Sequence, residues 1–164
     1  MAVKQIFALT NPYKQNGEEG ICTAASLAWC KCCLKLGRGL TSANELRPDA
    51  RALNAQMAVL RRFDNNPEAQ TEMAGLKWVK EFTAHSIDDV IREMKASPSH
   101  IGIFWNTVHT MGYSYSHNDK EFFDQNNGLY RAKTSKEIRG LFRSLGYGNP
   151  AWGPVQGGRI VSLT

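Results

Sequence analysis

The chain has 164 residues, of which 42% are hydrophobic and 21% charged, and its formal net charge is +5. This length lets one domain bury a sizeable core, and no stretch reaches the ~20 consecutive apolar residues of a membrane-spanning helix. The first residues lack the apolar core and cleavage site of a secretory signal peptide, so we expect no export by the general secretory route. The basic residues are scattered, which argues against a nucleic-acid interface.

The first half of the chain is predominantly helical after a short opening strand. The strand is predicted over Val3 to Leu9, and turn-forming residues at 11–20 lead from it to Cys22. Helical patterns follow at residues 24–34, after Pro48 up to 63, at 68–75 and at 86–95, and a strand is predicted at 76–82. Cys22 is therefore expected to open a mostly apolar, buried helix.

From His100 onward, the hydrophobic pattern changes from that of helices to that of strands. Strands are predicted at residues 101–105, 108–115, 121–124 and 129–131, with turn-forming groups at 116–119 and 125–128 between them. A helix at 135–145 and a strand at 159–163 close the chain. Helices that precede an antiparallel sheet indicate an α+β fold, and without internal repeats or a long linker we expect residues 1–164 to form one domain.

Four cysteines lie within twelve positions, at 22, 30, 32 and 33. Neighbouring residues on a helix point to different sides, so disulfides among them would strain the helix, and their spacing does not match a zinc site. We therefore expect reduced thiols, no metal and no other cofactor. Cys22 differs from the other three because a helix amino terminus lowers the pKa of a thiol, whereas Cys30, Cys32 and Cys33 are predicted to pack as small apolar residues.

A nucleophilic thiol needs a base, and the base needs a group that orients it. His109 is the preferred base because it opens an apolar strand; the other histidines flank a helix or lie in a hairpin turn: His85, His100 and His117. Asp124 ends the following strand after two phenylalanines, and a hairpin would bring this poorly solvated carboxylate beside His109. The alternatives are an ordinary strand histidine at 109 and an Asp124 side chain that only closes its own turn.

Three segments resemble the YopT-like and AvrPphB-like bacterial effector cysteine peptidases, which have a papain-like fold. Residues 20–29 are similar to the nucleophile segment of that family, and His109–Gly112 is similar to its histidine strand. Phe122–Gly128 is similar to its aspartate motif, Phe-Phe-Asp-Pro-Asn-x-Gly, with Gln125 in place of the usual proline. The resemblance implies a papain-like domain with helices packed on a carboxy-terminal antiparallel sheet.

The same resemblance assigns a role to each matching residue. Cys22 would be the nucleophile, His109 the general base and then acid, and Asp124 the group that orients His109. An oxyanion donor is expected shortly before the nucleophile; Asn16 is the first choice and Gln15 the second, with the Cys22 backbone N–H as the other donor. A simple turn at Asn16-Gly17 is the alternative.

By resemblance, the chain is expected to be a thiol hydrolase that cleaves an amide bond in a protein or peptide substrate. Such an effector or toxin would be made in the bacterial cytoplasm and exported by a specialised secretion system, with a secretion chaperone or immunity protein as a partner. Two alternatives stay open: a papain-like peptidoglycan amidase toxin, and a non-catalytic binding module of the same fold. Glutamine deamidation and acyl transfer would use the same three residues.

Overall fold

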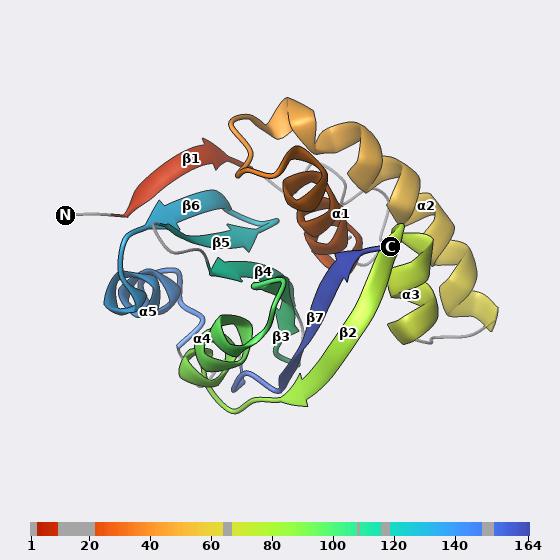
Figure 1. Cartoon of the computed structure of the whole chain (residues 1–164). Helices are drawn as coiled ribbons and strands as arrows, with labels where there is room; N and C mark the ends of the chain where they lie inside the picture. The colour runs from red at the N-terminus through yellow and green to blue at the C-terminus, as the bar shows by residue number, and fades with distance from the viewer. Residues whose placement is uncertain (1–2, 10–21, 64–66, 108, 116–118, 149–152) are drawn as a thin grey trace.

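The computed structural model describes residues 3–9, 22–63, 67–107, 109–115, 119–148 and 153–164, except for the side chains of 58–63. Within these residues the helices are α1 (Cys22–Leu36), the 3-10 helix η1 (Ala43–Glu45), α2 (Arg47–Phe63), α3 (Pro67–Met73), α4 (Ile87–Ala96) and α5 (Ser135–Ser144), as Figure 1 shows. The strands are β1 (Lys4–Ala8), β2 (Leu76–Thr83), β3 (Ile101–Trp105), β4 (Thr110–Tyr115), β5 (Lys120–Asp124), β6 (Gly128–Ala132) and β7 (Gly157–Leu163). The α+β class expected from the sequence is confirmed.

The strands form one sheet in the order β1-β6-β5-β4-β3-β7-β2, and every neighbouring pair is antiparallel. The meander predicted after His100 forms the centre, where β3 to β6 pair consecutively. The last strand, β7, inserts between β3 and β2, while β1 joins the opposite edge beside β6. These non-local pairings place the first and last strands of the chain in one sheet.

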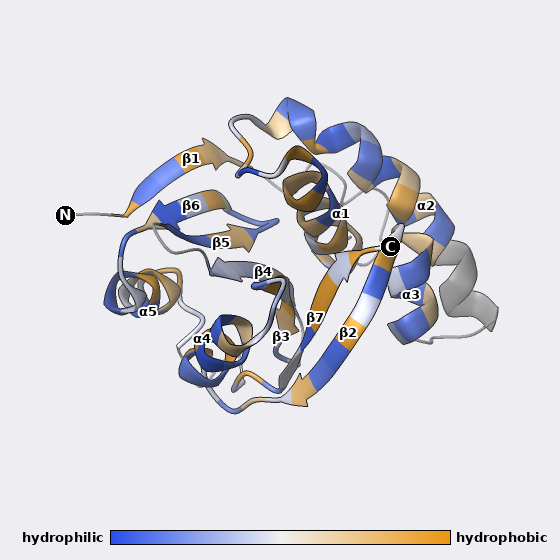
Figure 2. Ribbon diagram, in the orientation of Figure 1, coloured by the Kyte–Doolittle hydropathy of each residue, from blue (hydrophilic) through white to orange (hydrophobic). Residues whose placement is uncertain are grey.

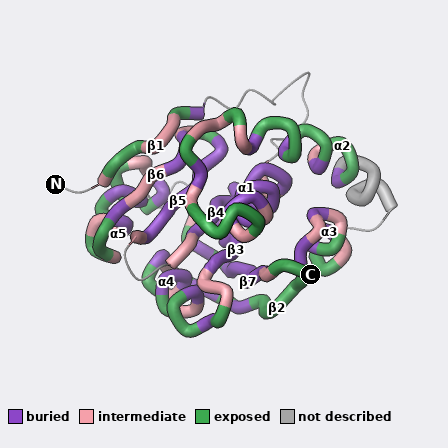
Figure 3. Tube along the Cα trace, turned by 45° about the horizontal axis from the view of Figure 1, so that its top comes forward, coloured by how far each residue is buried: buried purple, intermediate pink, exposed green. Residues whose placement is uncertain are grey.

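Two hydrophobic cores lie on opposite faces of this sheet. The first core contains α1 and residues of α2, and the second contains the inner faces of α4 and α5. Figure 2 shows that hydrophobic residues predominate along α1, whereas α2 and α4 are largely hydrophilic. Because α1 has almost no polar face, it lies between the sheet and α2 and is buried along most of its length, as Figure 3 shows.

Close packing of Trp29 fixes α1 against β4. The Trp29 ring stacks on Phe123 of β5, with centroids 5.5 Å apart and planes within 6°. A Cβ atom at Gly112 of β4 would lie only 2.5 Å from Cε3 of Trp29, so the glycine allows the indole to approach the strand. Full burial of a side chain of this size contributes about 2–3 kcal/mol to the free energy of unfolding. This contact sets the position of α1 relative to the start of β4.

The start of α4 is stabilised by a side chain other than that of its N-cap residue. Ser86 occupies the N-cap of α4 with extended backbone angles, but its side chain makes no capping hydrogen bond. The Asp89 carboxylate instead accepts a hydrogen bond from the His85 backbone N–H at 2.8 Å. A longer side chain in the first turn therefore supplies the negative group that the start of the helix favours.

Candidate active site

Cys22 is the first residue of α1, and its side chain is partly exposed. Hydrogen bonds from the backbone and side chain of Thr110, the first residue of β4, reach the sulfur. Two further contacts hold the helix end on this strand: Thr23 Oγ1 lies 3.0 Å from Thr110 Oγ1, and the Ser26 hydroxyl donates to the Thr110 carbonyl at 3.4 Å. The thiol is therefore held where the amino terminus of α1 meets the sheet.

His109 directly precedes β4 and is only 6% exposed. Its backbone is fixed by a reciprocal pair of hydrogen bonds, in which its N–H donates to Asn106 Oδ1 at 2.8 Å and its carbonyl accepts from the Asn106 N–H at 3.1 Å. The imidazole is hydrogen-bonded to the Cys22 thiol on one side, and its Nε2 lies 2.7 Å from Asp124 Oδ1 on the other. Because Nε2 faces Asp124, Nδ1 is the nitrogen that faces the sulfur.

Asp124 is completely buried at the end of β5, and both of its oxygens are fully engaged. Oδ1 accepts from His109 Nε2 and from the Asn126 backbone N–H at 3.0 Å. Oδ2 accepts from Asn127 Nδ2 at 2.5 Å and from the Tyr147 hydroxyl at 2.6 Å. The Asp124 side chain therefore contacts His109 and also closes its own turn, so it does more than the turn-closing alternative required.

The three groups shift one another's pKa values. Burial alone would raise the pKa of Cys22, but the hydrogen bond and charge of His109 lower it below its ordinary value. Burial disfavours the charged form of His109, yet Asp124 and Cys22 together raise its pKa to about 9. Burial likewise opposes ionisation of Asp124, but hydrogen bonds from His109, Tyr147 and Asn127 keep its pKa lowered. Between the pKa of Cys22 and that of His109, the pair is thiolate and imidazolium.

Tyr147 completes the surroundings of His109 and Asp124. Its ring stacks on the imidazole, with centroids 5.6 Å apart and planes within 18°. Its hydroxyl donates to Asp124, and the side chain is almost fully buried. Tyr147, Asn106 and Asn127 are not among the site residues that the sequence predicts. The sequence feature that could indicate Tyr147 is the Gly-Tyr-Gly motif just after a predicted helix, but this motif does not reveal that the tyrosine contacts Asp124.

The structure thus brings together Cys22, His109 and Asp124, which the sequence analysis had singled out. Asn16 and Gln15, the expected oxyanion donors, lie outside the described residues, as does His117. Cys30, Cys32 and Cys33 are free and buried in α1, which confirms their predicted packing role. Burial raises the pKa of each of these three thiols, and nearby acidic side chains add to the effect at Cys32, whose pKa rises to about 11, and at Cys33.

In the part of the chain that the structure describes, no His, Cys, Asp and Glu side chains gather in a group suited to hold a metal ion. The same residues include no helix with the length and hydropathy of a membrane span.

Neither a family model nor a curated protein sequence matches the chain. Several solved structures are similar to it over almost its whole length. The ubiquitin-specific protease of a murine cytomegalovirus tegument protein, solved with a ubiquitin-based suicide substrate, superposes with a TM-score of 0.66 at 13% identity, covering 98% of this chain and 85% of that one. The Pseudomonas avirulence protein AvrPphB has a TM-score of 0.61 at 18% identity, with 99% and 97% covered.

A third similar structure is PatoxP, the cysteine protease-like domain of the Photorhabdus asymbiotica toxin PaTox. It has a TM-score of 0.62 at 14% identity, and the match covers 98% of this chain and 54% of that one. At such identities the similarity establishes the fold. The chain therefore has the papain-like cysteine protease fold that its sequence indicated.

Proposed function

We propose that this chain is a thiol hydrolase that cleaves amide bonds, with one papain-like catalytic domain over residues 1–164. Cys22 is the nucleophile, His109 the general base and acid, and Asp124 the group that orients His109. The observation that carries the proposal is the unbroken hydrogen-bonded row of thiol, imidazole and carboxylate at the amino terminus of α1. A thiolate, a proton donor beside it and a buried carboxylate behind that donor are the groups that acyl transfer to sulfur requires.

In the first half of the reaction, the Cys22 thiolate attacks the carbonyl carbon and forms a C–S bond. The C–N bond then breaks as His109 gives its Nδ1 proton to the leaving nitrogen, which departs as an amine. In the second half, neutral His109 takes a proton from water, the hydroxide attacks the thioester, and the carboxylic acid and the Cys22 thiolate are released. Asp124 stays ionised throughout and stabilises the imidazolium form.

The developing oxyanion needs hydrogen-bond donors near the thiol. We propose the Cys22 backbone N–H as one donor and Asn16 as the other, with Gln15 in reserve. Asn16→Ala is expected to lower kcat by about 100-fold with little change in KM, since an oxyanion donor acts mainly in the transition state. The same loss in Gln15→Ala, with Asn16→Ala unaffected, would move the assignment to Gln15.

We propose a protein as substrate and an effector or toxin as the biological setting, in line with the resemblance of three segments to the YopT-like and AvrPphB-like peptidases. The folds of AvrPphB and of the toxin domain PatoxP support this setting. A protein substrate also fits the similar viral protease, which was solved with a ubiquitin-based suicide substrate. Delivery by a specialised secretion system and a partnering chaperone or immunity protein belong to the same proposal.

The test is a comparison of three substrate classes with matched variants. The purified chain is incubated with a proteome-derived peptide library, with purified peptidoglycan, and with a ubiquitin-based suicide substrate. We expect cleavage in the peptide library that Cys22→Ala and His109→Ala lower by at least about 1,000-fold. Cys32→Ala is the matched control, because this thiol is buried with a raised pKa and should leave the rate unchanged.

The outcomes separate the proposed function from its alternatives. Release of wall fragments without peptide cleavage would favour a peptidoglycan amidase. Conversion of glutamine to glutamate in the library, without chain cleavage, would show deamidation. No turnover, together with a Cys22 alkylation rate no higher than that of a model thiol peptide, would indicate a non-catalytic binding module and refute the hydrolase.

A further inference from the structure

Tyr147 reaches the site through the way in which α5 ends. Leu145 is the C-cap of this helix, and Gly146 follows it with φ +93°, a backbone conformation that glycine adopts without strain. The Gly146 N–H donates to the Arg143 carbonyl at 3.0 Å, and the Tyr147 N–H donates to the Phe142 carbonyl at 3.1 Å. This pair of bonds is a Schellman motif, which reverses the chain and directs Tyr147 back toward the sheet.

Aromatic neighbours then fix the Tyr147 ring. Its centroid lies 5.5 Å from that of Phe142 of α5 and 6.5 Å from that of Phe122 of β5. With only 4% of the residue exposed, the ring has little freedom to move away from His109. The fold therefore presents this side chain as a rigid element rather than as a surface residue that happens to touch the site.

Tyr147 acts on two of the three reacting groups at once. The hydroxyl donates to Asp124 Oδ2, the oxygen that does not face His109, and this bond favours the ionised carboxylate. The ring covers the imidazole face, which fixes its plane and keeps water from the bond between His109 Nε2 and Asp124 Oδ1.

We propose that Tyr147 is a positioning residue, which holds Asp124 and the His109 imidazole in line so that the imidazole can serve the Cys22 thiol. The inference rests on the proposed function, because it assigns Tyr147 a role in the same row of groups. It extends that row to a fourth side chain, delivered by the carboxyl end of α5. A purely structural tyrosine would add to the stability of the second core without acting through Asp124.

The test measures alkylation of Cys22 by iodoacetamide, with Cys22→Ala as the background. Tyr147→Phe removes the hydroxyl and keeps the ring, and Tyr147→Leu removes both. Tyr113→Phe is the matched control: Tyr113 is also buried, and its hydroxyl has no hydrogen-bond partner in the described part of the chain. Far-ultraviolet circular dichroism and urea unfolding establish that each variant is folded under the assay conditions.

We expect Tyr147→Phe to lower the alkylation rate by about 10-fold, the size expected for loss of a hydrogen bond to a charged group. Tyr147→Leu should lower it by about 100-fold, because the imidazole also loses its fixed orientation. The acid limb of the rate-against-pH profile should move to higher pH in Tyr147→Phe, because Asp124 loses a donor that favours its ionised form. Tyr113→Phe should leave both the rate and the acid limb unchanged.

A double-mutant cycle shows whether Tyr147 acts through Asp124. In an Asp124→Asn background, Tyr147→Phe should lower the rate by less than about 2-fold, because the group that it positions has already been lost. Equal losses in both backgrounds, or a Tyr147→Phe protein with the wild-type rate and acid limb, would overturn the proposal. Alkylation reports the thiolate and not turnover, so the two proposals can fail separately. A chain that cleaves no substrate counts against the proposed function, whereas the role of Tyr147 is decided by the alkylation rates.

Discussion

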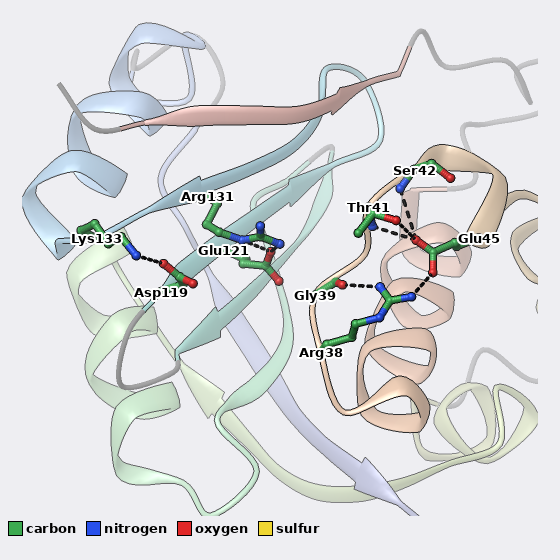
Figure 4. A network of polar contacts seen from close by, with 9 residues as sticks. All are labelled: Arg38, Gly39, Thr41, Ser42, Glu45, Asp119, Glu121, Arg131 and Lys133. Atoms are coloured by element: carbon green, nitrogen blue, oxygen red, sulfur yellow. Dashed lines mark hydrogen bonds and ion pairs between the residues drawn. The ribbon is translucent and has the colours of Figure 1, made fainter.

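Two buried carboxylates lie three residues apart on β5, and their surroundings have opposite effects. Asp124 accepts four hydrogen bonds, from His109, Asn126, Asn127 and Tyr147, and its pKa is lowered despite complete burial. Among its described contacts, Glu121 accepts hydrogen bonds from Arg131 alone, through Nε at 2.9 Å and Nη2 at 2.6 Å. Figure 4 shows this pair. Its pKa is raised, because the Arg131 charge does not offset the effect of burial.

The thiols of α1 show the same contrast from one end of the helix to the other. At the amino terminus, burial opposes ionisation of the partly exposed Cys22, but the hydrogen bond and charge of His109 lower its pKa. Eleven residues further along the helix, Cys33 is buried near Glu121, and both the burial and that negative charge raise its pKa. The four cysteines have the same side chain, so the difference lies in the neighbours that the fold supplies.

These two pairs show that burial alone does not make a reactive group in this fold. Burial opposes ionisation at Cys22, Asp124, Cys33 and Glu121 alike. Only at the end of the sheet where α1 begins do enough donors and an opposite charge converge to reverse this effect. The other end holds ion pairs that tie strands and loops together, such as Arg131 with Glu121 and Arg38 with Glu45.

The largest contrast is expected in thiol reactivity. At pH 7, iodoacetamide should alkylate Cys22 roughly 1,000-fold faster than Cys30, Cys32 or Cys33, because Cys22 is partly exposed and its pKa is lowered, whereas the other three thiols are buried and their pKa values are raised. Mass spectrometry of peptides after timed quenching measures the four rates separately. An alkylation rate of Cys33 close to that of Cys22 would contradict the expected difference in thiol reactivity along α1.

Substitutions of Asp124 and Glu121 should have different effects on the rate of amide hydrolysis. Asp124→Asn is expected to lower amide hydrolysis by about 100-fold or more, because the amide no longer stabilises the imidazolium. Glu121→Gln should leave the rate within about 2-fold, because the Glu121 side chain pairs with Arg131 and not with His109 or Asp124 in its described contacts. Rate assays and urea unfolding of both variants give the comparison, and a large rate loss in Glu121→Gln would contradict it.

Much of this arrangement was predictable because its signals are local. The change of hydrophobic period at His100 predicted the sheet, and Cys22 before an apolar segment predicted a thiol at a helix start. Asp124 stood out because a carboxylate that follows two phenylalanines at a strand end needs a partner. Each of these inferences uses residues that are neighbours along the chain or are brought together by a single hairpin.

Some of what sequence reasoning missed depends on non-local packing. Tyr147 meets Asp124 only because α5 packs on the sheet and ends in a Schellman motif at Gly146. The position of β7 between β3 and β2 likewise depends on contacts between distant segments, for which a single sequence contains no pattern. The assignment of Asn16 and Gln15 as oxyanion donors stays a prediction, since both lie outside the described residues.

The pH dependence of stability should have opposite signs at the two carboxylates. The lowered pKa of Asp124 stabilises the fold above its ordinary value of 3.8, and this contribution is lost as pH falls below that value. The pKa of Glu121 is raised above its ordinary value of 4.5, so between these two values the folded chain binds a proton that the unfolded chain has lost. The free energy of unfolding therefore falls as pH rises from 4.5 through the folded-state pKa of Glu121.

Urea unfolding between pH 3 and pH 7 measures this dependence. The free energy of unfolding of each variant is subtracted from that of the wild type at the same pH, which cancels the contribution of the other carboxylates. The two differences should have opposite signs, because the pKa of Asp124 is lowered and that of Glu121 is raised. Asp124→Asn should remove the loss below pH 3.8, and Glu121→Gln should remove the decline above pH 4.5. If the free-energy differences for Asp124→Asn and Glu121→Gln changed with pH in the same direction, the two carboxylates would not have opposite pKa shifts.

The smallest effect concerns Gly39, which lies against the ion pair of Arg131 and Glu121. A Cβ at this position would lie 2.5 Å from Arg131 Nη2 and 2.6 Å from Glu121 Oε2, so Gly39→Ala forces the pair apart. Because Arg131 is partly exposed and can shift, we expect a loss of about 1 kcal/mol in the free energy of unfolding, with unchanged hydrolysis.

Gly140→Ala on α5 is the matched control for Gly39→Ala. Apart from its chain neighbours and the backbone of its own helix, no atom lies within 4 Å of an added Cβ at Gly140, and alanine favours the helix by about 0.5–1 kcal/mol. We expect Gly39→Ala to lower the free energy of unfolding and Gly140→Ala to raise it. Such opposite changes would show that the loss at Gly39 comes from displacement of the ion pair and not from loss of a glycine. Unchanged hydrolysis in both variants would confine the role of the Glu121 end of β5 to stability, whereas a loss of activity in Gly39→Ala alone would connect that end to the thiol.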